Sequence, residues 1–183
     1  MTADSVTVSN QLIKRIKESA YLTGKYTTRA GNQTNYYIDK YLFGTQPDIL
    51  NLVASEVSKI LPPLHSFDCI AAPELGAVSI AAALSIKINK PFVIVRKGKK
   101  GYGTNNRIEG QYKKNDTMII IEDVLSTGGA ALAALTVLRD NNINVTEVIG
   151  VINREEGALE NIRKEGLVGK GLITSTMLHN ASS

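Results

Sequence analysis

Four short apolar runs in the middle of the chain constrain its fold more than any other feature. They occupy residues 67–72, 92–95, 118–121 and 145–152. Their apolar positions do not alternate with polar ones, which is typical of strands buried on both faces of a parallel sheet. Helical patterns over residues 77–88 and 130–141 separate some of these runs. The sequence therefore predicts an α/β fold with a mainly parallel central sheet flanked by helices.

Two more helices are predicted before the first of these runs. Apolar residues recur at helical spacing over residues 12–21, and a second helical pattern runs from Pro47 to the Pro62-Pro63 pair. Between these helices, residues 26–35 are polar and rich in turn residues, and residues 36–38 predict a short strand. This order predicts a small N-terminal region in front of the main sheet.

Length and composition place the chain among globular proteins with one domain. It has 183 residues, of which 43% are hydrophobic and 21% charged, which excludes a disordered or fibrous chain. Its single cysteine, Cys69, cannot form an intrachain disulfide, which favours a reducing compartment. No run approaches the roughly 18–20 apolar residues that span a membrane, and the first residues lack a signal-peptide layout. We expect a cytoplasmic protein without a membrane partner.

The positive charge of the chain is concentrated in one segment. The formal net charge is +4, but residues 96–114 carry seven Lys and Arg against one carboxylate, so the rest is slightly acidic. Within this segment, residues 98–111 are rich in Gly, Asn and Lys and show no apolar period. Such a loop suits a mobile clamp for a polyanion. A solvated surface loop and a nucleic-acid patch are the alternatives, and no row of interleaved aromatic side chains supports the second.

An acidic pair and a glycine-rich turn follow the apolar run at 118–121. Glu122 and Asp123 come first, and residues 126–129 then read Ser-Thr-Gly-Gly before a predicted helix. Backbone N–H groups and hydroxyls at a helix N-terminus suit a phosphate dianion, whereas the carboxylates suit sugar hydroxyls or magnesium. The turn is not a P-loop, because no Gly-Lys-Ser/Thr follows. An ordinary strand-to-helix turn is the alternative interpretation.

This motif resembles the signature of the type I phosphoribosyltransferases. The resemblance implies a single domain over residues 1–183, in which residues 1–45 and the C-terminal segment form a hood over the base site. It also implies that Glu122 and Asp123 hold the ribose of 5-phosphoribosyl 1-diphosphate. The 5-phosphate is then expected on Val124, Leu125, Ser126, Thr127, Gly128, Gly129 and Ala130.

The basic loop resembles the catalytic loop of the orotate phosphoribosyltransferases. The resemblance implies that Arg96, Lys97 and Lys100 contact the diphosphate and that Tyr102, where many members carry His, also lies against this substrate. It further implies a homodimer in which the loop at residues 97–110 reaches the site of the other subunit. The catalytic residues implied are Lys100, Glu122 and Asp123.

Two more segments resemble the orotate enzymes. Residues 28–31, Thr-Arg-Ala-Gly, and residues 34–39 are similar to the segments that contact the base, and Arg154 follows the last apolar run. The orotate-binding residues implied are Arg29, Tyr37, Ile38, Ser126 and Arg154. An arginine at a strand end can also pair with Glu155 or Glu156, and Tyr36 and Tyr37 can also be core residues. The turn after the first apolar run carries Glu74-Leu75, where many orotate enzymes carry Tyr-Lys.

The resemblance implies the activity of an orotate phosphoribosyltransferase in pyrimidine biosynthesis. Orotate would displace diphosphate from 5-phosphoribosyl 1-diphosphate, giving orotidine 5′-monophosphate. We expect Mg²⁺ as cofactor, held mainly through the substrate rather than by side chains. Two alternatives remain: a purine or other base phosphoribosyltransferase, and a non-catalytic regulator of the same fold that binds nucleic acid. We expect small-molecule partners and no nucleic acid, since the charges are local and Arg154 favours an anionic base.

Overall fold

The computed structural model describes residues 8–27, 31, 33–98 and 106–181. Its centre is a six-stranded sheet in the order β5-β4-β3-β6-β7-β8. The strands are β3 (Cys69–Pro73), β4 (Phe92–Val95), β5 (Ile108–Glu109), β6 (Thr117–Leu125), β7 (Asn144–Asn153) and β8 (Val168–Thr174). All pair in parallel except β5, which runs antiparallel to β4 at the edge. The predicted α/β fold is confirmed.

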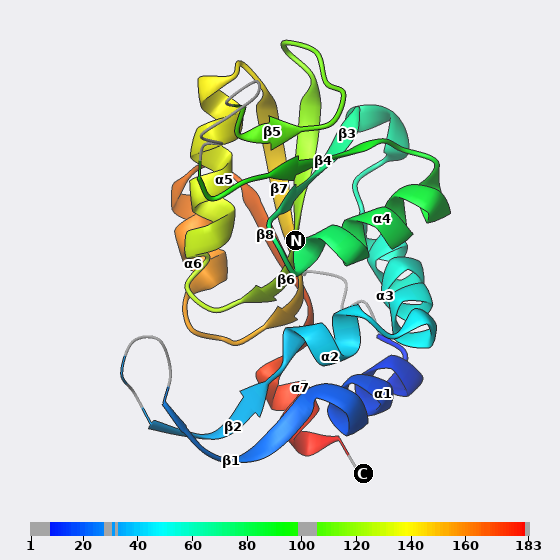
Figure 1. Cartoon of the computed structure of the whole chain (residues 1–183), viewed down its shortest axis with the longest axis vertical. Helices are drawn as coiled ribbons and strands as arrows, with labels where there is room; N and C mark the ends of the chain where they lie inside the picture. The colour runs from blue at the N-terminus through cyan, green and yellow to red at the C-terminus, as the bar shows by residue number, and fades with distance from the viewer. Residues whose placement is uncertain (1–7, 28–30, 32, 99–105, 182–183) are drawn as a thin grey trace, which may run out of the picture.

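Helices cover both faces of this sheet. They are α3 (Pro47–Ile60), α4 (Ala77–Ile88), α5 (Gly129–Asp140) and α6 (Ala158–Lys164), with a 3-10 turn at Leu64–Ser66. Helices α3 and α4 lie on one face, and α5 and α6 lie on the other (Figure 1).

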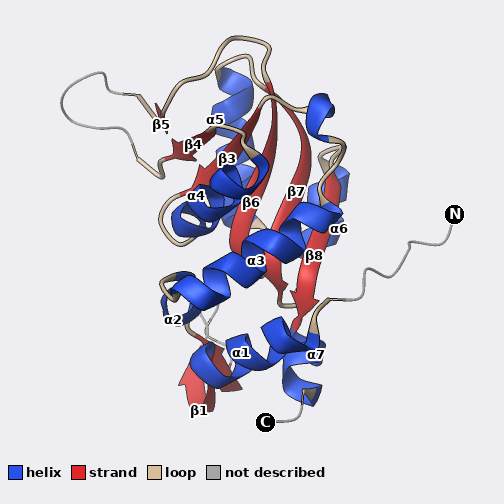
Figure 2. Cartoon of the chain, turned by 90° about the vertical axis from the view of Figure 1, so that its right-hand side faces the viewer, coloured by secondary structure: helices blue, strands red, loops and turns tan. Residues whose placement is uncertain are grey.

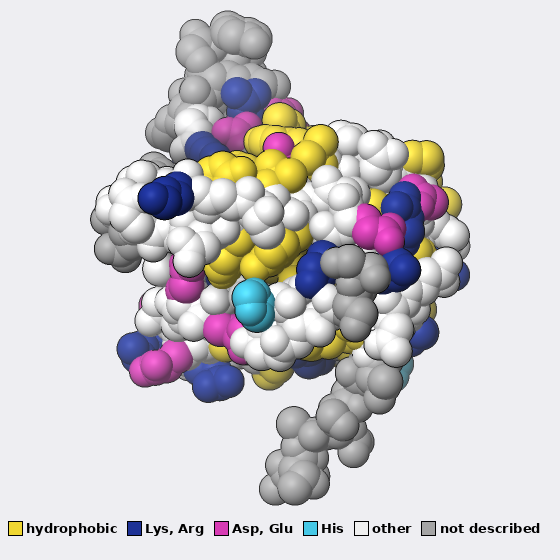
Figure 3. Space-filling view, turned by 90° about the horizontal axis from the view of Figure 1, so that it is seen from below, with side chains coloured by type: hydrophobic (Ala, Val, Ile, Leu, Met, Phe, Trp, Pro, Cys, Tyr) yellow, Lys and Arg dark blue, Asp and Glu magenta, His cyan; other side chains and the backbone are white. Residues whose placement is uncertain are grey.

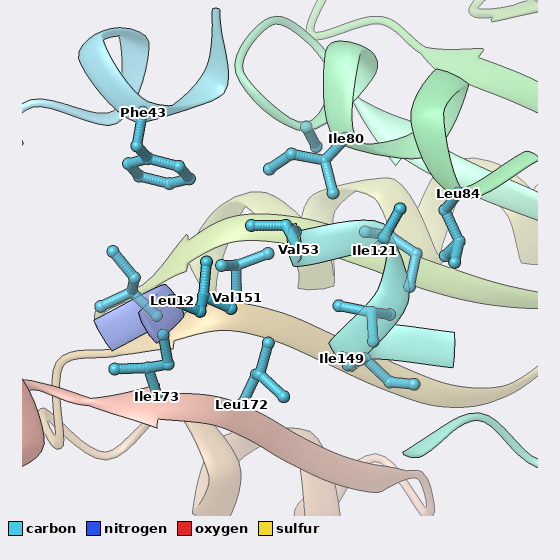
Figure 4. Packing of buried hydrophobic residues seen from close by; sticks show 14 of the residues in the cluster. Leu12, Phe43, Val53, Ile80, Leu84, Ile121, Ile149, Val151, Leu172 and Ile173 are labelled. Carbon is cyan, nitrogen blue, oxygen red and sulfur yellow. The ribbon is translucent and has the colours of Figure 1, made fainter. Parts of the chain in front are cut away.

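The core has two parts because neighbouring residues of β6 point to opposite faces. Ile119 and Ile121 pack with residues of α3 and α4, whereas Met118 and Ile120 pack with residues of α5. The first of these clusters is shown in Figure 4, where Ile121 lies among side chains from both helices and from neighbouring strands. This double burial is why the strand sequence does not alternate.

A small N-terminal region lies beyond the carboxyl ends of the central strands. It contains α1 (Asn10–Ala20), the antiparallel strands β1 (Tyr21–Thr27) and β2 (Gln33–Ile38), and α2 (Lys40–Gly44). The last helix, α7 (Ser175–Asn180), lies beside α1 (Figures 1 and 2). Seen from below, this region exposes hydrophobic side chains among charged ones (Figure 3).

The prediction was wrong for residues 21–27, where we expected a helix end and a loop. The helix ends at Ala20, and Tyr21 begins a strand that pairs with Ile38. The Tyr21 ring stacks on Tyr36 with centroids 5.0 Å apart. Because most residues of β1 are exposed, they carry no alternating apolar pattern that would reveal the strand.

Other elements also differ from expectation. The long loop predicted at residues 98–111 contains β5, whose Ile108 is 3% exposed and packs on the core. Strand β6 continues four residues past Ile121, so Glu122 and Asp123 lie inside a strand and not after it. Helices α2 and α6 were not predicted. Both are short, and short helices carry too few turns to show a period.

Gly150 tests the close approach of β7 to β6. A Cβ at this position would lie 2.5 Å from Cγ and Cδ1 of Leu125, the last residue of β6. We expect Gly150→Ala to lower the free energy of unfolding by about 1–3 kcal/mol through overpacking, as measured by urea denaturation. Gly98→Ala is the matched control, since nothing lies within 4 Å of its Cβ, and it should change stability by less than about 0.5 kcal/mol. Equal stability of the two variants would contradict the steric argument.

Candidate active site

A cavity of about 1000 Å³ opens at the carboxyl ends of β6 and β7. Ligands of open α/β sheets bind at this edge, beyond the carboxyl ends of parallel strands. The cavity is lined by the turn and helix start at residues 124–131, by residues of β2 and by four charged side chains. The four charged residues are Lys97, Glu122, Arg154 and Glu156. The structure therefore brings residues from distant parts of the sequence into one site.

The turn after β6 forms the floor of the cavity. Leu125 ends the strand, and α5 begins at Gly129 after Gly128, whose φ of 85° lies in the left-handed region that favours glycine. Gly128 is the N-cap residue of α5 and has no side chain, so it makes no capping hydrogen bond to the first backbone N–H groups of the helix. These groups and the positive end of the helix dipole suit a phosphate dianion.

Neighbouring elements hold this turn in place. Asn161 of α6 donates from Nδ2 to the carbonyl oxygen of Thr127 at 3.0 Å, and the Arg154 N–H donates to the Leu125 carbonyl at 2.8 Å. A Cβ on Gly128 would lie 3.5 Å from the backbone of Ala158. The turn between β6 and α5 is thus held by contacts with α6 and with Arg154, the residue that follows β7.

The acidic pair is buried, and its two carboxylates have different surroundings. Glu122 is 5% exposed and lines the cavity. Asp123 is 1% exposed and turns toward α2, where its Oδ2 lies 2.9 Å from Nζ of Lys40. Burial, and after it the neighbouring charge of Asp123, raise the pKa of Glu122 to about 9 against the opposing charges of Lys40 and Lys97. These surroundings favour the protonated form of Glu122.

Arg154 lies at the far side of the cavity with a side chain that is 16% exposed. Its guanidinium lies over the ring of Tyr36, 5.5 Å from the centroid, and Nη2 lies 3.0 Å from Oε1 of Glu156. Its buried Nε has no hydrogen-bond partner among the described residues. The salt bridge weighed as an alternative is present, and the same guanidinium still faces the cavity. A planar carboxylate can bind such a guanidinium through two parallel bonds.

The C-terminal helix supports this side of the site. The hydroxyl of Tyr36 donates to Oγ of Ser175 at 3.4 Å, and Oε2 of Glu155 accepts from both N–H and Oγ1 of Thr176. The start of α7 therefore holds both Tyr36, whose ring lies under the Arg154 guanidinium, and Glu155, which follows Arg154 in the chain.

The structure brings Tyr36 to the cavity, and not Tyr37 or Ile38. Tyr37 is 43% exposed and its ring packs on Tyr26, while Ile38 is 6% exposed and belongs to the core. Because alternate residues of a strand point to opposite faces, Tyr36 and Tyr37 cannot both face the cavity. Tyr36 is therefore the residue of this pair that lines the cavity, and the placement of Tyr37 and Ile38 beside the base stays a prediction.

Only part of the predicted basic cluster lies within the described residues. Lys97 lines the cavity, and its N–H donates to Oε1 of Glu74 at 2.7 Å. The Arg96 guanidinium lies 4.0 Å from Glu74 and 3.8 Å from Glu109. The predicted residues Arg29, Lys100 and Tyr102 lie outside the described residues.

The sequence reasoning missed Lys40, Glu156 and Asn161 as parts of the site. No local sequence pattern indicates that Lys40 belongs to the site, because its partner Asp123 is far away in the sequence. Glu74, interpreted as a departure from the orotate pattern, anchors the start of the basic loop. Within the described ranges, no three His, Cys, Asp or Glu side chains group in a way that could hold a metal. No helix there is long and apolar enough to cross a membrane.

Glu122→Gln tests the raised pKa. The pKa of Glu122 rises from 4.5 unfolded to about 9 folded. The folded protein therefore binds one more proton than the unfolded chain between these values. The contribution of Glu122 to stability is full below pH 4.5 and is lost as the pH rises toward 9.

Glutamine does not titrate, so Glu122→Gln should gain stability relative to wild type between pH 5 and pH 8.5. The relative gain is expected to exceed about 1 kcal/mol, measured by urea denaturation at both pH values. A stability difference that stays constant across this range would contradict the raised pKa.

Comparison with known proteins agrees with this geometry. Residues 46–165 match the family model of the phosphoribosyl transferase domain. The chain is 36% identical over 172 residues to the orotate phosphoribosyltransferase of Methanocella arvoryzae, covering 93% of this chain and 97% of that protein. It is 41% identical over 168 residues to the orotate phosphoribosyltransferase of Pyrococcus horikoshii, covering 91% and 90%.

Solved structures show the same likeness. The orotate phosphoribosyltransferase of Aeropyrum pernix has a TM-score of 0.82 and 25% identity, covering 91% of this chain and 95% of that one. The UMP synthase of Leishmania donovani has a TM-score of 0.84 and 31% identity over 94% of this chain, which spans 38% of that protein. The glycine-rich turn, Glu122 of the acidic pair and the Arg154 guanidinium line one cavity. With these relatives across nearly its whole length, the chain belongs to the orotate phosphoribosyltransferase family of phosphoribosyl transferases.

Proposed function

We propose that the protein transfers the phosphoribosyl group of 5-phosphoribosyl 1-diphosphate to orotate, releasing diphosphate and giving orotidine 5′-monophosphate in pyrimidine biosynthesis. One observation carries the proposal: the turn after β6, the acidic pair and Arg154 line or adjoin one cavity in a chain of this family. Each of these groups matches a different part of the two substrates. In this assignment the anomeric carbon would lie between them.

The 5-phosphate is assigned to the turn at residues 125–130, and the ribose to Glu122 and Asp123. N–H groups at the start of α5 point where a dianion gains most from the helix dipole. Sugar hydroxyls both donate and accept hydrogen bonds, so they suit a carboxyl pair that shares one proton. The phosphate and ribose contacts would hold C1 of the sugar fixed, which is the positioning part of catalysis.

Orotate is assigned to the side of Arg154. The guanidinium would bind the orotate carboxylate through two bonds, and the buried Nε without a partner supports this role. The Tyr36 ring supports the opposite face of the guanidinium. In the free protein Glu156 occupies one edge of this group, so orotate would exchange with that carboxylate.

The reaction forms a bond from the orotate ring nitrogen to C1 as the bond from C1 to the diphosphate oxygen breaks, and the proton of that ring nitrogen is released with the diphosphate. Negative charge grows on the leaving diphosphate, and Lys97, which lines the cavity beside the basic loop, is assigned to this anion. Arg96 is assigned to the same anion after exchange of its carboxylate neighbours, and Lys100 is the third cation that the family resemblance implies. Preorganised cations at a leaving group stabilise the transition state more than the ground state.

Magnesium is assigned to the substrate more than to the protein. Asp123 is paired with Lys40, and no three His, Cys, Asp or Glu side chains of the described residues group together, so side chains alone offer few oxygen ligands for a cation. The residues present fit an ion that arrives on the diphosphate oxygens and offsets their charge. The acidic pair and Lys97 would then lie around the complex of magnesium and diphosphate.

A homodimer completes the proposal. Both ends of the basic loop are anchored, since the Arg96 N–H donates to the Arg107 carbonyl and the Arg107 guanidinium donates to the Arg96 and Lys97 carbonyls. From these anchors the loop at residues 97–110 would reach a partner's site. Large hydrophobic side chains exposed on or beside α2 and α4 support a protein contact there. They are Tyr41, Leu42, Leu75 and Ile86.

The N-terminal region and α7 are assigned the role of a hood over the base site within a single domain. Tyr36 and Ser175, which belong to these two parts, lie at the guanidinium side of the cavity. The proposed compartment is the cytoplasm, where a buried free thiol such as Cys69 stays reduced.

The base preference tests the function directly. The protein, 5-phosphoribosyl 1-diphosphate and Mg²⁺ are incubated with orotate, uracil, adenine, guanine or hypoxanthine, and diphosphate is measured. We expect release with orotate alone, because only this base presents a carboxylate to Arg154. Release with a purine but not with orotate would contradict the proposal. Binding of nucleic acid without any diphosphate release would point to a regulator.

Arg154→Gln tests the base site. Loss of a charge-assisted contact to the orotate carboxylate costs about 1.5–3 kcal/mol, so kcat/KM for orotate should fall about 10- to 150-fold. The affinity for 5-phosphoribosyl 1-diphosphate should stay within about twofold. Arg163→Gln on the exposed face of α6 is the matched control and should behave like wild type. An unchanged kcat/KM for Arg154→Gln would remove this residue from the site.

A further inference from the structure

Lys40 occupies a position between the N-terminal region and the catalytic end of the sheet. It is the first residue of α2, which lies beside the ends of β6 and α4 (Figure 1). Its Nζ lies 2.9 Å from Oδ2 of Asp123 and 5.7 Å from the centre of the Tyr41 ring. Lys40 is thus the described cation in direct contact with the acidic pair.

This ion pair differs from the exposed pairs on the surface of the molecule. The side chain of Asp123 is 2% exposed and that of Lys40 is 32% exposed, whereas the Lys164–Glu160 pair on α6 is 65% and 70% exposed. Exposed pairs contribute little, but removing one partner of a buried pair leaves an uncompensated charge. Lys40 therefore compensates the negative charge of the buried Asp123 carboxylate.

The backbone leaves space for the pair. A Cβ on Gly76, in the turn between β3 and α4, would overlap the Asp123 carboxylate and lie 3.2 Å from Cε of Lys40. Only glycine at position 76 lets the lysine and the carboxylate meet against the start of α4. Three elements that are distant in sequence converge on this one contact.

Both oxygens of Asp123 are thereby engaged. Lys40 lies at Oδ2, and the N–H of Val124 donates to Oδ1 at 2.6 Å. Burial lowers the pKa of Lys40, but the hydrogen bond and the charges of Asp123 and Glu122 outweigh this effect and raise it, so Lys40 stays a cation. The carboxylate is held in one orientation next to Glu122, which faces the cavity.

We propose that Lys40 is a positioning residue for the phosphoribosyl substrate: it holds Asp123 in the orientation in which the acidic pair binds the ribose. The proposal rests on the proposed function, because it assigns Lys40 to the same site. It acts through Asp123 and not through its own contact with substrate. Loss of Lys40 should therefore weaken binding of 5-phosphoribosyl 1-diphosphate and spare the orotate side, where Arg154 lies.

The test compares Lys40→Met, which keeps the length of the side chain, with Lys40→Arg, which keeps the charge. Calorimetry measures the Kd of 5-phosphoribosyl 1-diphosphate with Mg²⁺ and no base. We expect Lys40→Met to raise this Kd at least tenfold and Lys40→Arg to stay within threefold of wild type. The KM for orotate at saturating 5-phosphoribosyl 1-diphosphate should change less than twofold. Lys164→Met, which removes an exposed pair, is the matched control and should bind like wild type.

A double-mutant cycle tests whether Lys40 acts through Asp123. Asp123→Asn alone should weaken binding, and Lys40→Met combined with Asp123→Asn should bind within twofold of Asp123→Asn. Thermal denaturation checks that each variant is folded. Additive losses would mean that Lys40 contacts the substrate itself, and a lower Tm with a wild-type Kd would mean a purely structural role. Either result overturns the proposal.

The binding measurement separates this proposal from the proposed function. It contains no base, so a wild-type protein that binds 5-phosphoribosyl 1-diphosphate but does not use orotate would contradict the function alone. A wild-type protein that uses orotate, with Lys40→Met binding normally, would contradict the role of Lys40 alone.

Discussion

The burial of both faces of β6 is the constraint on which the rest of the structure depends. This strand lies between β3 and β7, and its residues alternate between the core under α3 and α4 and the core under α5. Burial of apolar surface on both sides fixes the register and direction of the strand. Everything attached to its carboxyl end, namely the acidic pair and the turn before α5, is therefore placed with the precision of the core.

Because the acidic pair belongs to this buried strand, two carboxyl groups lie inside the protein. Two adjacent buried charges repel each other and lose hydration, and the structure meets this with one proton and one cation. Glu122, whose pKa is raised, faces the cavity, whereas Asp123 meets Lys40. Two carboxyl groups of similar chemistry thus differ in charge environment, because their surroundings differ.

The N-terminal region contacts two sides of the candidate site. Strand β2 places Tyr36 beneath the Arg154 guanidinium, and the helix that follows places Lys40 at Asp123. A short segment, from residue 36 to residue 40, thus reaches both Arg154 and the acidic pair, the sides that we propose for the base and the ribose. Helix α7 returns to the same region through Ser175, so both ends of the described chain shape one side of the cavity.

The sequence by itself determined the parallel sheet and the turn that leads from the acidic pair into a helix at residues 122–129, because apolar runs and a strand–turn–helix motif are local patterns. It did not reveal β1, whose exposed residues carry no period, or the choice of Tyr36 over Tyr37, which depends on the face that β2 presents. The partnership of Lys40 and Asp123 was decided only by the tertiary structure. Two residues so far apart in sequence meet only after the sheet and α2 have packed, and no local pattern encodes that contact.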